Sequence, residues 1–322
     1  MDTDNRDWLP DSCLGDGFRI KYVTQPDDYS GHVRCTIVRS VVPSPRAIGV
    51  LYVHGFSDYF FQAEMAAMFV RAGYAFYAVD LRKYGRSLLP GQKMFQVRDL
   101  HEYFADINAA IAQMKADAIS QIVLLGHSTG GLTTALYMSE SPDEAVKALI
   151  LNSPFLDWNL PLAARMAIPA LRAAGRLFPD IPVHQKPDRG YAESLLADFG
   201  GEWDYRRDWK PDVLPDVDAG WVRAIDIAQR HLHHADIKIP VLLMHSSASV
   251  RKGDSRDKYS HADAILDVER IARHGRHLGS DVTEVTVPDG LHDLVLSQPS
   301  VRTLVYTDML TWLRTIGLSP TK

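Results

Sequence analysis

Residues 122–132 read I-V-L-L-G-H-S-T-G-G-L, and this stretch decides how the rest of the chain is interpreted. A short apolar, β-branched run ends at Gly126, and apolar residues at helix-compatible spacing follow Gly130. The pattern predicts a strand that turns directly into a helix, with Ser128 at the apex of the turn. Both flanking glycines fit this geometry, because a Cβ at either position would keep the strand and the helix apart.

A G-x-S-x-G turn of this kind has two interpretations. It has the form of a nucleophile elbow, in which a strained turn exposes the hydroxyl of Ser128. The same letters also fit a glycine-rich turn with a capping serine, which would cradle a phosphate at the helix N-terminus. A serine hydroxyl is a poor nucleophile without a base and an orienting carboxylate, so residues elsewhere in the chain decide between the two interpretations.

The composition describes a globular protein with material for a large core. Of the 322 residues, 46% are hydrophobic and 23% are charged, and the formal net charge is −5, which does not favour nucleic acid as a partner. Cys13 and Cys35 lack metal-site spacing and are too few for a disulfide framework, which favours a reducing compartment. Residues 1–5 show no secretory signal, and no apolar run reaches about 18 residues. We therefore expect a cytoplasmic protein without a transmembrane segment.

The order of predicted elements is that of an α/β fold with a mostly parallel, eight-stranded sheet. Residues 17–25 and 32–42 alternate apolar and charged side chains, which predicts an antiparallel pair at the sheet edge. The later strands are continuously apolar, as strands covered on both faces are, and helical patterns separate them. These strands are expected at 48–53, at 74–79, from 122 to the elbow, at 148–151, at 239–245 and at 282–287.

Between residues 155 and 236 the alternation of strand and helix stops. Apolar helical patterns at 160–178 and 219–232 stand among many prolines and aromatics, and a structureless loop of this length is implausible. We expect a helical cap at 155–236, inserted into an α/β core of residues 1–154 and 237–322. Two roles fit its apolar side chains equally, a pocket for an apolar group and the cap's own core. These side chains are Leu160, Leu162, Met166, Ile168, Leu171, Phe178, Trp203 and Trp209.

A candidate base for Ser128 follows it in the chain. His292 lies in a glycine-containing loop directly after the last predicted strand, so it is expected at the carboxyl edge of the sheet where the elbow also opens. An isolated loop histidine is usually a solvated residue. The position of His292 after the last strand, together with the elbow, favours the catalytic interpretation.

The candidate acid is displaced from the simplest position. A carboxylate is expected after the strand 239–245, near position 249, but that residue is Ser249. We assign the acid to Asp263, at the start of a predicted helix, and interpret the stretch before it as an insertion. Helix N-capping is the alternative role for Asp263. The same loop also offers Asp254, Asp257 and Asp267 as candidate acids, and Asp157, after the preceding strand, is a further alternative.

The backbone N–H groups of Phe56 and Thr129 are the expected donors to a developing oxyanion, since they follow the strand end at 48–53 and the candidate nucleophile. His54 and His127 are expected to hold loop geometry rather than to transfer protons. No metal or organic cofactor is expected.

A run of histidines at the end of the second cap helix is also expected to be structural. No carboxylate or cysteine stands at ligand spacing around this run, which favours a solvated helix end over a metal site. The run consists of His231, His233 and His234.

Together these features resemble the α/β-hydrolase superfamily, in particular serine hydrolases of the monoacylglycerol lipase, lysophospholipase and serine aminopeptidase S33 type. The resemblance covers most of the core and implies an α/β-hydrolase fold. Two departures from the pattern stand out: Lys83 replaces the usual glycine of its loop, which predicts an altered pocket wall, and Ser249 occupies the usual acid position. The matching stretches are His54-Gly55-Phe56, residues 80–87 (D-L-R-K-Y-G-R-S), residues 126–131 (G-H-S-T-G-G) and Leu291-His292-Asp293.

We expect hydrolysis of a small apolar carboxylic ester through Ser128, His292 and Asp263 with an acyl-enzyme intermediate. An amidase, an aminopeptidase or a C–C bond hydrolase would use the same three residues. A ligand-binding homologue that has lost turnover is the alternative from another class, motivated by the displaced acid. Transient contact with a lipid surface is compatible with an apolar cap.

Overall fold

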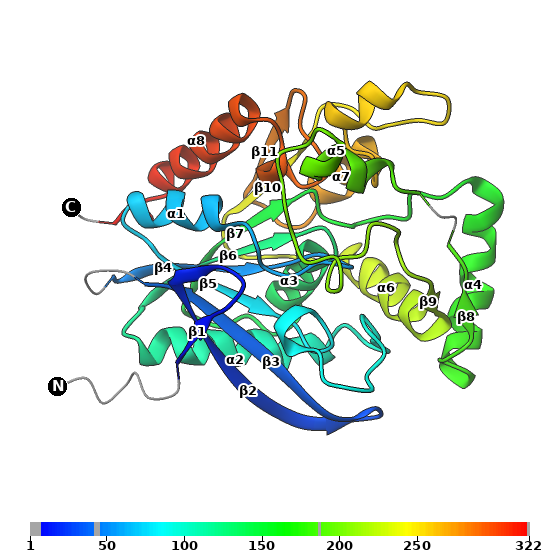
Figure 1. Cartoon of the computed structure of the whole chain (residues 1–322), viewed down its shortest axis with the longest axis horizontal. Coiled ribbons are helices and arrows are strands. Elements are labelled where there is room, and N and C mark those ends of the chain that lie inside the picture. The colour runs from blue at the N-terminus through cyan, green and yellow to red at the C-terminus, as the bar shows by residue number, and fades with distance from the viewer. Residues whose placement is uncertain (1–7, 42–45, 186–187, 321–322) are drawn as a thin grey trace.

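The computed structural model describes residues 8–41, 46–185 and 188–320. Its centre is a nine-stranded sheet with the strand order β1-β2-β3-β5-β4-β6-β7-β10-β11 (Figure 1). The strands of this sheet are β1 (Leu9–Asp11), β2 (Gly15–Asp28), β3 (Gly31–Ser40), β4 (Ile48–Val53), β5 (Ala75–Asp80), β6 (Gln121–His127), β7 (Val146–Asn152), β10 (Val241–Ser246) and β11 (Val282–Val287).

The eight predicted strands are all present, and the sheet is mostly parallel as expected. Strands β2 and β3 form an antiparallel pair at the edge, β3 runs antiparallel to β5, and the six strands from β5 to β11 run parallel. The ninth strand, β1, pairs with β2 and escapes prediction because three residues cannot display a period-two pattern. Val42, the last residue of the predicted strand 32–42, lies outside the described residues.

Helices cover both faces of the sheet. Along β4, Leu51 and Val53 belong to one apolar core and Val50 and Tyr52 to the other, because successive side chains point to opposite faces. This explains why the central strands are continuously apolar. Helices α1 and α8 pack in the second core, and α2, α3 and α7 pack in the first. Their bounds are α1 (Ala63–Arg71), α2 (Glu102–Ala116), α3 (Thr129–Glu140), α7 (Val268–Gly275) and α8 (Pro299–Thr315).

The segment between β7 and β10 interrupts the alternation of strand and helix, as predicted. It holds helices close to both predicted ranges, and α6 packs against both α3 and α4 (Figure 1). The sequence patterns did not predict α5 or the small β8–β9 pair. Its elements are α4 (Leu162–Leu177), β8 (Pro182–Val183), α5 (Gly190–Leu195), η2 (Ala197–Phe199), β9 (Val217–Asp218) and α6 (Ala219–Leu232).

The apolar side chains predicted for this segment divide between interior and surface. Ile168 is buried in the first core, and Trp203 and Trp209 pack against buried aromatics that include Phe61. Other members, Leu162, Met166 and Phe178, are exposed around α4. Among the described residues, no helix is both long enough and apolar enough to span a lipid bilayer.

Candidate active site

Ser128 occupies a sharp turn between β6 and α3. Its backbone has φ 53° and ψ −116°, a conformation that residues with a Cβ rarely adopt. A Cβ on Gly126 would lie 2.6 Å from the carbonyl oxygen of Gly130, and one on Gly130 would lie 2.3 Å from that of His54. The glycines of G-x-S-x-G thus allow strand, helix and the end of β4 to meet at Ser128.

The structure brings Ser128, His292 and Asp263 together in one hydrogen-bonded row. His292 Nε2 lies 2.9 Å from Ser128 Oγ, and His292 Nδ1 lies 2.9 Å from Asp263 Oδ2. Since a carboxylate only accepts, Nδ1 carries the proton in the neutral ring and Nε2 is free to accept from the serine hydroxyl. All three are buried, with exposed fractions of 7% for Ser128, 4% for His292 and 0% for Asp263.

Asp263 reaches this position because the chain returns to the end of β10. Residue 263 forms an isolated parallel bridge with Ser249, and two backbone hydrogen bonds hold it there, from Val250 N to Asp263 O at 2.8 Å and from Asp263 N to Ala248 O at 2.9 Å. Residues 250–262 therefore form an excursion that starts and ends beside the simplest acid position. Asp263 therefore lies beside position 249, where the simplest pattern expects the acid, although it comes 14 positions later in the chain.

The Asp263 carboxylate also fills its alternative role. Oδ1 accepts the backbone N–H groups of Ile265 and Leu266 at 2.8 and 2.7 Å, while Oδ2 faces His292. One oxygen thus fixes the carboxylate to the following turn, and the other remains available to the imidazole. The two roles are compatible because a carboxylate has two acceptor oxygens.

The alternative acids lie in other environments. Asp157 forms ion pairs with Arg165 and Arg270, at 3.0 and 2.6 Å. Asp254 accepts the backbone N–H of Arg251 within the excursion, and Asp257 is exposed. Among these carboxylates and Asp263, only Asp263 has a hydrogen bond to His292 within the described residues.

A buried network that the sequence did not reveal holds the loop of His292. The side-chain amide of Asn152 donates to Asp293 Oδ1 at 2.7 Å, and that of Gln62 donates to Asp293 Oδ2 at 3.1 Å. The N–H of Asp293 donates to the Tyr191 hydroxyl at 3.0 Å, and the Tyr191 and His292 rings are 5.8 Å apart. The sequence feature that could have pointed to this network is the polar Asn152 at the carboxyl end of an apolar strand.

His54 and His127 are both buried and both bind backbone groups. His54 Nδ1 lies 2.8 Å from the carbonyl of Gly55, and its Nε2 accepts the N–H of Leu81 at 3.1 Å. His127 Nδ1 lies 3.1 Å from the carbonyl of Asn152, and burial lowers the pKa of this ring. Both contacts are those of residues that hold loop geometry, as the sequence predicted.

The loop after β5 is fixed by buried ion pairs. Arg86 contacts the carboxylates of Asp80 and Asp11 at 2.8 and 2.7 Å, and these contacts outweigh burial and raise the pKa of its guanidinium. Lys83, which departs from the resemblance, has its amine 2.7 Å from Asp28 in β2. Its charged end is therefore engaged by the edge hairpin.

The backbone N–H groups of Phe56 and Thr129 form no hydrogen bond with any acceptor in the described part of the chain. Thr129 is the first residue of α3, where N–H groups lack an intrahelical partner. A Cβ on Gly55 would lie 3.0 Å from Ser128 Cβ, so the backbone before Phe56 passes close to the elbow. Both donors are thus free and belong to segments that meet at Ser128.

Aromatic side chains from the segment between β7 and β10 cover this region. The rings of Phe56 and Trp221 are 4.9 Å apart, and Trp158 and Trp221 are 6.1 Å apart. Phe95, from the loop before α2, lies 5.3 Å from Phe56. Two aromatic rings therefore pack directly on the Phe56 side chain.

The doubly covered parallel sheet and the elbow after β6 define an α/β hydrolase. The chain belongs to the serine aminopeptidase, S33, family, whose model matches residues 43–298. This confirms the resemblance inferred from the sequence motifs. No curated protein sequence matches the chain.

Solved structures of lipases and esterases share the fold. The monoacylglycerol lipase of Paleococcus ferrophilus is 20% identical, with a TM-score of 0.66 over 88% of this chain and 99% of that one. A soluble variant of monoglyceride lipase from Saccharomyces cerevisiae, in complex with a substrate analog, is 17% identical, with a TM-score of 0.68 over 93% and 96%. A thermophilic esterase from Thermogutta terrifontis is 18% identical, with a TM-score of 0.58 over 92% and 99%. The chain thus shares the α/β-hydrolase fold with these lipases and esterases.

Proposed function

We propose that this chain hydrolyses small apolar carboxylic esters. The observation that carries the proposal is the row of two 2.9 Å hydrogen bonds through Ser128, His292 and Asp263 at a strained elbow. Ser128 Oγ attacks the ester carbonyl while His292 accepts its proton, and His292 then returns that proton to the leaving alcohol. Water, activated by the same imidazole, cleaves the acyl-enzyme. Asp263 keeps the ring in the required tautomer and stabilises the imidazolium.

The N–H groups of Phe56 and Thr129 are proposed to bind the oxyanion of each tetrahedral intermediate. Both lack a partner among the described acceptors, and both belong to segments adjoining Ser128. Preorganised donors of this kind contribute about 10²–10³ in rate apiece. Their charge stabilisation is effective here because the site is buried, and charges interact more strongly there than in bulk water.

Residues 155–236 are proposed to form a cap over a core of residues 1–154 and 237–322. Two contacts support this role: Tyr191 hydrogen-bonds to the loop of His292, and Trp221 packs on Phe56. An apolar acyl group suits the aromatic surroundings of Phe56. Because Ser128 and His292 are almost fully buried, substrate entry requires the cap to move.

An aminopeptidase would need a free anion near Ser128 for the substrate's α-ammonium group. The buried carboxylates around the site are already paired, Asp58 with Lys210 at 3.0 Å and Asp293 with two side-chain amides. Asp263 faces His292. This favours a neutral ester over an N-terminal peptide, while the family's description makes amide hydrolysis the second candidate.

A fluorophosphonate probe tests the nucleophile. Wild type is expected to be labelled and Ser128→Ala to be unlabelled, with the exposed Ser247→Ala as a matched control that labels normally. Turnover of p-nitrophenyl esters of increasing chain length, compared with amino-acid p-nitroanilides, then tests the substrate class. An unlabelled wild type would favour the non-catalytic ligand-binding homologue, and faster cleavage of the anilides would replace the esterase with an amidase.

A further inference from the structure

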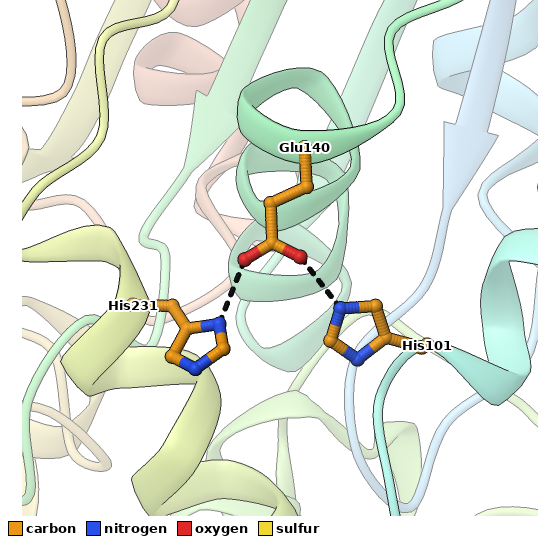
Figure 2. A group of neighbouring side chains, drawn as sticks. All are labelled: His101, Glu140 and His231. Atoms are coloured by element: carbon orange, nitrogen blue, oxygen red, sulfur yellow. Dashed lines mark hydrogen bonds and ion pairs between the residues drawn. The ribbon is translucent and has the colours of Figure 1, made fainter.

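A second cluster of titratable side chains lies at the surface, where three helices meet (Figure 2). His101 is the N-cap of α2, Glu140 is the last residue of α3, and His231 lies in the last turn of α6. One Glu140 oxygen lies 2.6 Å from His101 Nε2, and the other lies 2.7 Å from His231 Nδ1. The three side chains converge although they are distant in sequence.

This convergence alters the interpretation of the histidine run at the end of α6. Sequence spacing favoured a solvated helix end, because no carboxylate or cysteine stands at ligand spacing around the run. The folded chain supplies that carboxylate from α3 and a second imidazole from the start of α2.

Two imidazoles and one carboxylate form a donor set typical of zinc. The ligand atoms of His101, Glu140 and His231 all lie within 4.8 Å of one another. Tetrahedral zinc with bonds of about 2.0–2.1 Å places its ligand atoms roughly 3.3 Å apart. Small side-chain rotations reach this spacing, since the three side chains are 39%, 31% and 49% exposed and have room to move. Water from solvent completes the coordination.

Asp99 gives His101 the support that metal-binding histidines usually have. His101 Nδ1 lies 2.5 Å from Asp99 Oδ1, and the backbone N–H of His101 donates to the same oxygen at 3.1 Å. The carboxylate fixes the ring so that Nε2 faces Glu140. A carboxylate on the second ring nitrogen orients the ligand and raises its basicity.

Another group with metal-ligand atoms in close proximity, Asp58, His127 and Asp293, differs in an important respect. Its carboxylates are buried and already engaged by protein cations and amides, Asp58 by Lys210 and Asp293 by Asn152. A metal there would have to displace these partners. At the surface cluster, a metal would displace only the protons in the two hydrogen bonds between Glu140 and the histidines.

We propose that His101, Glu140 and His231 bind one divalent transition-metal ion of the zinc class. On binding, His101 Nε2 and His231 Nδ1 give up their protons, and each ring remains a neutral imidazole with one proton on its other nitrogen. Two metal–nitrogen bonds and a metal–oxygen bond then replace the two hydrogen bonds to Glu140. The ion clamps α6 onto α3 and the start of α2. Because α3 has 12 residues, about 18 Å of helix separates Glu140 from Ser128, and the ion takes no part in the chemistry there.

Zinc titration of the full chain, stripped of metal with a chelator and assayed by competition with a chromogenic chelator, tests the site. Wild type is expected to bind one Zn²⁺ per chain. His231→Ala and Glu140→Gln should weaken this binding more than Asp99→Asn, for which a loss of about 10–100-fold is expected. His234→Ala, an exposed histidine of the same run, is the matched control and should bind like wild type.

Thermal unfolding supplies a second readout. Zinc should raise the Tm of wild type and His234→Ala but not that of His231→Ala, because only an ion bound to the folded state stabilises it. Melting in chelator checks that each variant folds. The proposal is overturned if wild type binds no stoichiometric zinc, or if His231→Ala and His234→Ala bind it equally well.

Discussion

The side-chain amide of Asn152, the last residue of β7, donates to the Asp293 carboxylate at 2.7 Å. The Asn152 carbonyl also accepts the N–H of Ser128 at 3.1 Å, and its side-chain oxygen accepts that of Leu294 at 3.2 Å. One residue therefore couples the elbow to the loop that carries His292. The placement of Ser128 relative to His292 therefore depends on Asn152, a buried residue that is not part of the hydrogen-bonded row of Ser128, His292 and Asp263.

Asn152→Ala is expected to reduce kcat about 10²-fold with little change in KM, since misplacing a reacting group by about 1 Å costs this much. Asp293 would lose a buried donor, which also lowers the free energy of unfolding by about 1–3 kcal/mol. Steady-state kinetics and urea unfolding measure both effects. Asn108→Ala is the control for kcat, since its side chain accepts from the Tyr137 hydroxyl and has no contact with the His292 loop among the described residues. Equal kcat values for the two variants would contradict a positioning role for Asn152.

Asp263→Asn is expected to reduce kcat by about 10⁴. The loss arises because an amide can hold the imidazole in the wrong tautomer and cannot stabilise its charge. The Oδ1 contacts to Ile265 and Leu266 remain possible for asparagine, so the fold should be retained. Asp257→Asn, in the exposed excursion, should retain normal kcat. Near-normal turnover by Asp263→Asn would refute the assignment of the acid.

Arg86→Met is expected to lower the free energy of unfolding by about 3–5 kcal/mol, because it leaves Asp80 and Asp11 buried without their cation. Denaturant unfolding measures the loss. Lys115→Met removes a more exposed pair with Asp143 and should cost under about 1 kcal/mol. Similar losses in both variants would mean that burial adds nothing to the Arg86 network.

His127 makes stability depend on pH, because burial lowers its pKa from the ordinary value of about 6.5. As pH falls through 6.5 towards the folded pKa, the unfolded state takes up a proton that the folded state does not, so the free energy of unfolding decreases. His127→Gln lacks this contribution. The stability difference between wild type and this variant, measured by denaturant unfolding, should therefore be larger at pH 7 than at pH 5.5. A constant difference would show that the ring titrates normally in the folded state.

Sequence patterns predicted the sheet and the elbow because their causes are local. Continuous apolar runs follow from burial on both faces, and Gly126 and Gly130 follow from the close approach of backbone at Ser128. The sequence also predicted where His292 lies, because the carboxyl ends of parallel strands meet at one edge of the sheet. The three-residue strand β1 was not predicted, since it is too short to show a period-two pattern.

The tertiary structure decided which distant groups meet. Asp263 stands beside Ser249 because the chain makes an excursion and returns, and no spacing rule encodes the length of that excursion. Asn152 and Tyr191 join the His292 loop from a strand end and from α5. His101, Glu140 and His231 converge from three helices only after α6 packs on α3. Local residue patterns determine the elements, whereas packing between elements determines which side chains come within bonding distance.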